Sequence, residues 1–213
     1  MSYSVKEIFY TLQGEGANTG RAAVFCRFAG CNLWTGREED RHKAICQFCD
    51  TDFIGTDGIG GRHFKTAEEL AQNVFEAWQP KLNKKVRPLV VCTGGEPLLQ
   101  LDEELINKFH ELGFEVAVET NGTKPAPKGI DWICVSPKAD AELVLRSGDE
   151  LKLVYPQAEN TPEQFEDLDF RYFYLQPMDS SDSRKNTLSA IEYCKRNPRW
   201  QLSLQTHKIL GIP

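Results

Sequence analysis

Short apolar runs that alternate with segments of helical periodicity constrain the fold of this chain most strongly. Apolar or β-rich runs occur at 5–10, 22–28, 88–92, 114–119, 132–135, 150–154, 172–175 and 200–204. Between them, Thr66 and Glu69 form a capping box before an apolar helical stripe that ends at Trp78. Asp102 begins a second helix that stops at Gly113, and a third spans about 184–196. We therefore predict an α/β fold, a partial (β/α) barrel of mostly parallel strands with fewer helices than a full eightfold barrel.

The length of the chain favours one domain. At 213 residues, 40% hydrophobic and 26% charged, the chain can bury one sizeable core and has the composition of an ordinary globular protein. We interpret residues 1–213 as a single domain. Residues 30–62 show neither helical nor strand periodicity, and a connection of that length is more typical of a functional loop than of a linker.

Charge and hydropathy exclude several functions. No apolar run approaches the roughly 18 residues that cross a bilayer, and the first ten residues lack the regions of a signal peptide. We expect a cytoplasmic protein with no membrane partner. A net charge of -6 disfavours a phosphate-binding surface, so we expect no nucleic-acid partner.

Polar motifs follow four of the predicted strands. They are Thr93–Pro97, Glu119–Gly122, Ser136–Lys138 and Gln176–Asp179. The carboxyl ends of parallel strands form the ligand-binding rim of α/β folds. The four motifs should therefore converge on one site.

Three of the seven cysteines lie in the long loop. Fourteen residues separate Cys31 from Cys46, and two separate Cys46 from Cys49. Three thiolates would hold a 4Fe-4S cluster and leave one iron open to a ligand. A zinc knot is the alternative, with Cys26 as a fourth thiolate. Against it, Cys26 alternates with Val24 and Phe28 on one side of a buried strand.

The other cysteines have a simpler interpretation. Cys92, Cys134 and Cys194 stand in apolar or helical surroundings, where a cysteine fills the core as a small hydrophobe.

These motifs together resemble a known superfamily. The pair Cys46-Gln47-Phe48-Cys49, followed after the next major strand by a Gly-Gly-Glu-Pro sequence at 94–97, is similar to radical S-adenosylmethionine (SAM) enzymes. The usual spacing of their first two cysteines is three residues. The wider spacing seen here is a variation of the 7-carboxy-7-deazaguanine synthase family, which the chain resembles also at 9–16, 27–33, 49–51 and 211–213.

The resemblance implies residues for the cluster, for SAM and for a magnesium ion. Cys31, Cys46 and Cys49 would hold the cluster, and Thr51 would give a hydroxyl oxygen to Mg²⁺. The implied SAM-binding residues are Gly95, Ser136, Pro137, Lys138, Gln176, Pro177, Met178 and Asp179. Without the resemblance, these motifs would be ordinary loop chemistry.

Arg27 stands out because it interrupts an apolar strand, where an unpaired charge costs several kcal/mol. It needs an anionic partner, either a substrate carboxylate or a structural Asp or Glu. The resemblance favours the substrate carboxylate as the partner of Arg27. It also places Leu12, Gln13, Gly14, Thr93 and the terminal carboxylate of Pro213 around the substrate, with the apolar C-terminal residues docked. Gln13 to Glu15 otherwise suit a solvated turn, and His207 is more often structural than catalytic.

The family resemblance implies a reaction. Reduced cluster and SAM would generate a radical that takes hydrogen from 6-carboxy-5,6,7,8-tetrahydropterin, and ring contraction with loss of ammonia would give 7-carboxy-7-deazaguanine, the work of a carbon–nitrogen lyase. It also implies a homodimer and a reductant protein such as flavodoxin or ferredoxin. Two alternatives remain: a radical enzyme that activates a glycyl-radical protein, and a zinc-binding module without catalysis.

Overall fold

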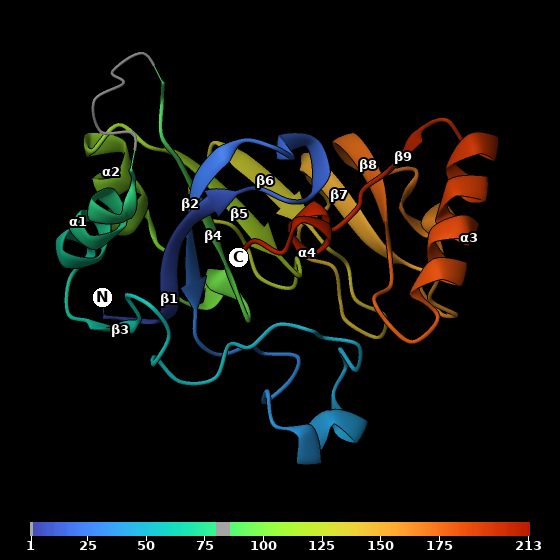
Figure 1. Ribbon diagram of the computed structural model, residues 1–213, viewed down its shortest axis with the longest axis horizontal. Helices are drawn as coiled ribbons and strands as arrows, with labels where there is room; N and C mark the ends of the chain where they lie inside the picture. Colours follow the sequence, from blue (N-terminus) through green and yellow to red (C-terminus); the bar gives the residue numbers. More distant parts are fainter. Residues whose placement is uncertain (1, 80–85) are drawn as a thin grey trace.

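The computed structural model describes residues 2–79 and 86–213, and it contains one nine-stranded sheet (Figure 1). The order across the sheet is β3-β1-β2-β4-β5-β6-β7-β8-β9. From β2 onward each strand is parallel to its neighbour, while β1 pairs antiparallel with both β2 and β3. The strands are β1 (Tyr3–Leu12), β2 (Ala22–Phe28), β3 (Arg62–Phe64), β4 (Leu89–Gly94), β5 (Glu115–Thr120), β6 (Trp132–Val135), β7 (Ser147–Tyr155), β8 (Asp169–Pro177) and β9 (Trp200–Leu202).

Helices cover the two ends of the sheet and leave its middle to loops. α1 (Ala67–Ala77) and α2 (Glu103–Glu111) pack together against the half that contains β1 and β5, and α3 (Ser183–Arg196) packs on β8 and β9 (Figure 1). A short α4 (Thr206–Leu210) follows β9. The prediction of a mostly parallel α/β fold with few helices is confirmed.

The capping residues act as the sequence predicts. Thr66 accepts a hydrogen bond from the backbone N–H of Glu69 at 3.1 Å, and Asp102 accepts one from Leu105 at 2.9 Å. Gly113 follows α2 with a φ of 86°, a left-handed conformation that glycine adopts without strain.

Strand alternation separates the core from the site. Val24, Cys26 and Phe28 of β2 face the apolar core under α1 and α2. Their neighbours Phe25 and Arg27 line the opposite face. In β7, Leu151 and Leu153 likewise join the core beneath α3, whereas Lys152 faces inward. Successive side chains of a strand point to opposite faces, so β2 and β7 each contribute both to the core and to the wall of the cavity.

Several elements depart from the sequence-based expectation: β1, β7 and β8 extend beyond the predicted runs, and short 3-10 helices at Gly16–Asn18, Pro97–Leu99 and Pro162–Phe165 were not predicted. The long stretch at 30–62 holds a 3-10 helix at Glu38–Lys43, and β3 begins at its end. α4 was not expected, and β9 ends at Leu202 rather than 204. The 3-10 helix at Glu38–Lys43 and β3 are short and have few or no buried residues. Their sequences therefore show no hydrophobic periodicity from which they could be predicted.

The helices of the described residues are all too short or too polar to cross a membrane.

Candidate functional site

A cavity of about 350 Å³ opens at the carboxyl ends of the parallel strands. The four polar motifs reach it, as their positions after the strands predict. The cavity is lined by all but one of the residues that the sequence suggested for cluster, SAM, magnesium or substrate: Leu12, Gln13, Gly14, Arg27, Cys31, Cys46, Cys49, Thr51, Thr93, Gly95, Ser136, Lys138, Gln176, Pro177, Met178, Asp179 and Pro213. Pro137 is outside that lining, and its carbonyl accepts a hydrogen bond from Asn160. The individual roles of these residues stay predictions.

The cysteine loop is held by its own small core. Trp34, Ala44 and Phe53 are buried together, and Cys31 and Cys49 pack against them. Arg41 lies 4.1 Å over the Trp34 ring and donates to the carbonyls of Gln47 and Cys49 at 2.8 and 3.0 Å. A single guanidinium thus fixes the backbone of the Cys46–Cys49 turn.

The thiols of this loop differ in acidity. The hydrogen bond from Cys46 lowers the pKa of Cys49 to about 6, and the N–H of Thr51 contributes, while burial opposes the shift. The same hydrogen bond, together with burial, raises the pKa of Cys46, and burial raises that of Cys31. Thiolates are the form that binds iron, and the low pKa of Cys49 favours that form. Three cysteine thiols that line one cavity, one of them acidic, are a donor set that fits an iron–sulfur cluster.

Cys26 takes no part in this group. It is fully buried in the core, next to Cys92 in the register of β2 with β4, and is absent from the cavity lining. This placement contradicts the four-cysteine zinc knot. Among residues 2–79 and 86–213, no three or more His, Cys, Asp or Glu side chains are grouped to hold a single metal ion.

Gly94 and Gly95 are required by backbone packing as well as by any ligand. A Cβ on Gly94 would lie 2.2 Å from the carbonyl oxygen of Phe28, and one on Gly95 would lie 2.0 Å from that of Gly30. Gly94 also has a φ of 136°. The glycine pair lets the segment that leads to Cys31 cross the end of β4 closely.

Glu96 joins two of the loops beneath the cavity. This fully buried carboxylate accepts hydrogen bonds from the N–H groups of Leu98 and Asn121, at 2.9 and 2.8 Å, and from the Thr120 hydroxyl at 2.7 Å. Burial raises its pKa, and the hydrogen bonds offset only part of that effect. Asn121 in turn donates to Asn32, beside Cys31.

The partner that Arg27 needs is present in the chain. Its Nε donates to Glu7 at 2.7 Å, and both residues line the cavity. A bidentate clamp on a ligand carboxylate would use two N–H groups of the guanidinium, and Nε is committed to Glu7. The structural alternative for Arg27 is therefore realised, and any contact with substrate must use its remaining nitrogens.

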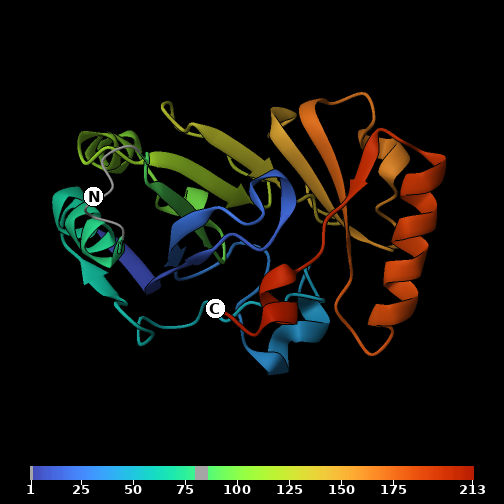
Figure 2. The same cartoon turned by 45° about the horizontal axis from the view of Figure 1, so that its top comes forward.

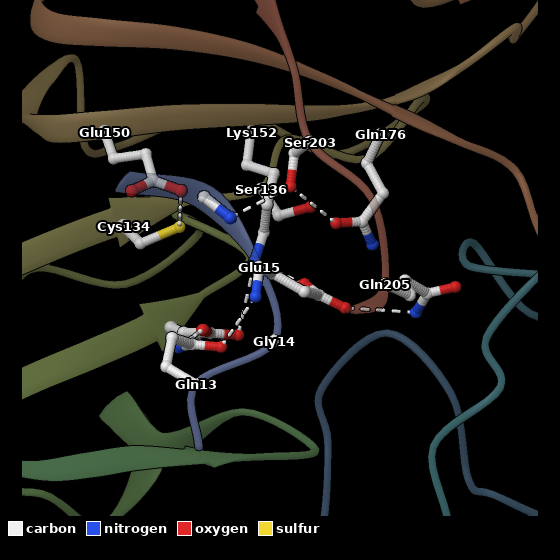
Figure 3. A network of polar contacts seen from close by, with 12 residues as sticks. Gln13, Gly14, Glu15, Cys134, Ser136, Glu150, Lys152, Gln176, Ser203 and Gln205 are labelled. Atoms are coloured by element: carbon white, nitrogen blue, oxygen red, sulfur yellow. Dashed lines mark hydrogen bonds and ion pairs between the residues drawn. The ribbon is translucent and has the colours of Figure 1, made fainter. Parts of the chain in front are cut away.

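A network of buried polar groups occupies the middle of the cavity wall (Figure 3). The amide of Gln13 donates to Glu119 at 2.7 Å, and the side-chain oxygen of Gln13 accepts from the Glu15 N–H at 3.1 Å. Lys152 contacts Glu15 at 2.5 Å and Glu119 at 3.5 Å, and Gln205 donates to the other Glu15 oxygen at 3.0 Å. Glu119 begins the polar motif predicted after the strand at 114–119, whereas the inward-facing Lys152 was not singled out from the sequence.

The C-terminal segment, with α4, returns close to the loop that joins β1 and β2, as Figures 1 and 2 show. Gln205, His207, Lys208 and Pro213 of this segment line the cavity. The Thr206 N–H and hydroxyl both donate to the carbonyl of Gly14, and the Thr11 hydroxyl donates to Pro213 at 3.0 Å. The expected docking of Pro213 near the cavity is present. His207 packs on Gly14, where a Cβ would lie 2.3 Å from its Nδ1.

Lys208 ties this segment to two of the candidate loops. Its ammonium contacts Asp50 at 2.5 Å and Asp179 at 2.6 Å. Asp50 follows the last cysteine of the loop, and Asp179 ends the polar motif after β8. One side chain of the C-terminal segment thus bridges the cysteine loop and the β8 loop.

Comparison with known proteins defines the class first. Residues 42–213 match the model of the Radical SAM superfamily, and the chain is a member of that superfamily. The crystal structure of QueE from Escherichia coli superposes with a TM-score of 0.63 at 25% identity, covering 96% of this chain and 94% of that one.

Two similar proteins identify the family within this superfamily. The 7-carboxy-7-deazaguanine synthase of Caulobacter vibrioides is 62% identical over 213 residues, and that of Bradyrhizobium diazoefficiens is 62% identical over 212. Both alignments cover 100% of each chain. The chain belongs to the 7-carboxy-7-deazaguanine synthase family.

Proposed function

We propose that this chain converts 6-carboxy-5,6,7,8-tetrahydropterin to 7-carboxy-7-deazaguanine with loss of ammonia, acting as a carbon–nitrogen lyase. The observation that carries the proposal is the convergence of Cys31, Cys46 and Cys49 with the four polar loops on one cavity, in a chain that matches relatives of that name over its full length. A cavity of about 350 Å³ is of the size that takes a small molecule.

The three loop cysteines would hold a 4Fe-4S cluster, and the loops after β4, β6 and β8 would hold SAM. When bound, these groups supply the electron and the 5′-deoxyadenosyl radical that starts the reaction on the substrate. The chain's own contribution is to orient the ligands: Lys138 donates to Ser136 at 2.6 Å, which fixes the β6 loop, and Lys208 holds Asp179 of the β8 loop. Pro137 would act through the backbone conformation of the β6 loop.

The substrate would lie against the polar network of the opposite wall. Gln13, Glu15 and Glu119 offer an amide and two carboxylates, which suit the N–H groups of a pterin edge. The remaining nitrogens of Arg27 are suited to the substrate carboxylate, with Leu12, Gly14, Thr93 and Pro213 as further contacts. Binding by buried polar groups discriminates strongly, because an analogue would leave them unpaired.

The hydroxyl of Thr51 would serve Mg²⁺ as one oxygen ligand, with substrate and water as the others. We infer a homodimer that works in the cytoplasm as one domain per chain and receives electrons from a protein such as flavodoxin or ferredoxin. These inferences rest on the family.

Anaerobic turnover tests the proposal. The iron-reconstituted protein would be given reductant, SAM, Mg²⁺ and 6-carboxytetrahydropterin, and the products analysed by mass spectrometry. We expect deazapurine from the wild type and from C26A, whose cysteine lies in the core, and none from C46A. Cleavage of SAM without deazapurine would refute the proposed substrate, and a colourless zinc-loaded protein would refute the radical chemistry.

A further inference from the structure

Lys152 is a buried cation held between two carboxylates of the cavity wall (Figure 3). Its side chain is 5% exposed, whereas those of Glu15 and Glu119 are 13% and 23% exposed. The ammonium is thus the most deeply buried of the three charged groups, and all three side chains line the cavity. Burying a charge costs free energy unless the charge is paired, and here the two carboxylates supply the pairing.

The two carboxylates keep unused accepting capacity. One oxygen of Glu15 contacts Lys152 and the other accepts from Gln205, while Glu119 accepts from Gln13 and faces Lys152 with its second oxygen. An ionised carboxylate has about four lone-pair sites. Each group can therefore accept another hydrogen bond from a ligand in the cavity.

The protonation of Glu15 depends on Lys152. Burial alone would raise the pKa of Glu15, but the charge and hydrogen bond of Lys152 lower it below its usual value. Two carboxylates close together in a poorly solvated site share one proton when no cation is present. A shared proton would turn an acceptor into a donor on the surface that meets the ligand.

Other titratable groups face the same cluster. Glu150 of β7 has its pKa raised by burial, accepts from the Ala17 N–H at 3.0 Å and lies by the Cys134 thiol of β6. His207 of α4 packs on Gly14, and its charge contributes to the lowered pKa of Glu15. Lys152 lies among three acidic side chains, Glu15, Glu119 and Glu150, and its ammonium contacts the first two.

We propose that Lys152 is a positioning residue that keeps Glu15 and Glu119 ionised and oriented as acceptors for a planar ligand edge rich in N–H donors. This inference rests on the proposed function, which supplies such an edge in the pterin and in the deazapurine product. In this role Lys152 pairs with the two glutamates, and the glutamates make the hydrogen bonds to the ligand. The effect of Lys152 passes through the two glutamates.

Ligand binding to the holoenzyme measures this role directly. The probe is 7-carboxy-7-deazaguanine, titrated calorimetrically into cluster-loaded protein with SAM under anaerobic conditions, in phosphate and in Tris. Comparing the two buffers gives the number of protons released on binding. The variant is K152M, which keeps the length of the side chain, and the control is K108M, which removes an exposed ammonium paired with Glu111 and Glu68.

We expect K152M to bind about tenfold to a hundredfold more weakly, the range for hydrogen bonds to charged groups. It should also release about one more proton per ligand than the wild type, because the shared proton must leave before both glutamates can accept. K108M should match the wild type. Equal affinity in K152M, or weaker binding without extra proton release, would overturn the inference.

A second pair of variants carries the test if K152M does not fold. In E15Q a single carboxylate, Glu119, remains, so there is no second carboxylate with which it could share a proton. Loss of Lys152 should then matter less: K152M/E15Q should bind the product less than tenfold more weakly than E15Q and should release no extra proton. A larger loss would overturn the inference. If the wild type binds no product at all, the proposed function fails, which is a result distinct from either variant outcome.

Discussion

Replacing Gly95 with alanine tests whether close backbone packing delivers Cys31 to the cavity. The new Cβ would lie 2.0 Å from the carbonyl oxygen of Gly30 and 2.9 Å from the Cβ of Cys31. Neither atom is the end of a flexible side chain, so the segment must retreat by about 1.4 Å to reach an ordinary contact. That movement stretches the hydrogen bond from the Glu96 N–H to Gly30, now 2.9 Å.

Overpacking of this kind costs about 1–3 kcal/mol, and a lost backbone hydrogen bond about 1 kcal/mol. G95A should therefore be less stable by about 2–4 kcal/mol, which corresponds to a Tm lowered by about 4–16 °C for a chain of this size. The assay is thermal unfolding of the cluster-free protein by circular dichroism. Iron content after reconstitution is measured alongside, and it should fall because Cys31 is displaced.

Gly20→Ala is the matched control. Gly20 has a φ of 85°, and no atom lies within 4 Å of the position that the alanine methyl group would take. Alanine there meets only the backbone penalty of about 1–2 kcal/mol. G20A should bind a full complement of iron. The reasoning is refuted if G95A unfolds at the wild-type temperature and also takes up iron normally.

Three further predictions concern the loops and the buried network. R41M should lose iron several-fold faster than the wild type on exposure to a chelator, because Arg41 holds the carbonyls of Gln47 and Cys49. K208Q should raise the KM for SAM several-fold while changing stability by less than about 1 kcal/mol in urea, because its ion pairs are half exposed and tie two ligand loops. The lowered pKa of Glu15 means that its ionised form stabilises the fold above the unfolded value of about 4.3, and this stability is lost as pH falls through the folded pKa. The difference in urea stability between wild type and E15Q should therefore be largest at neutral pH and shrink below about pH 4.

The elements that the sequence predicted well are those with a strong local signal. Thr66 and Asp102 cap their helices, and the apolar runs of β2, β4 and β5 lie in the sheet where their patterns placed them. β3 and α4 carry no such signal. β3 has three residues and buries only Phe64, and α4 has five residues and buries none. Both form because distant segments hold them, as Tyr3 pairs with Phe64 and Gly14 accepts from Thr206.

The same limit applies to the site. The cysteines and the polar loops were visible as motifs, but the partner of Arg27 was open between a ligand and a side chain, and Glu7 is twenty positions away in the chain. Lys152 carries the same signal as Arg27, because it interrupts the apolar run Leu151 to Leu153 as Arg27 interrupts Phe25 to Phe28. The signal that identified Arg27 would have found Lys152. What the sequence could not give is the pairing of Lys152 with Glu15, since the two residues meet only when β7 lies opposite the loop after β1.

The wide spacing of the first two cysteines also has a physical explanation in the structure. The Ile45 N–H donates to the carbonyl of Leu33 at 3.1 Å, so the residues between them leave and return at nearly the same point. The excursion contains the 3-10 helix at Glu38–Lys43 and is anchored by the burial of Trp34 and Ala44 against Phe53. Closing a longer loop costs little extra entropy, and here the packing of the excursion offsets that cost. Residues can therefore be accommodated between Cys31 and Cys46 without moving either thiol from the cavity, because the position of Cys31 is set by its crossing of β4 and that of Cys46 by the turn that Arg41 holds.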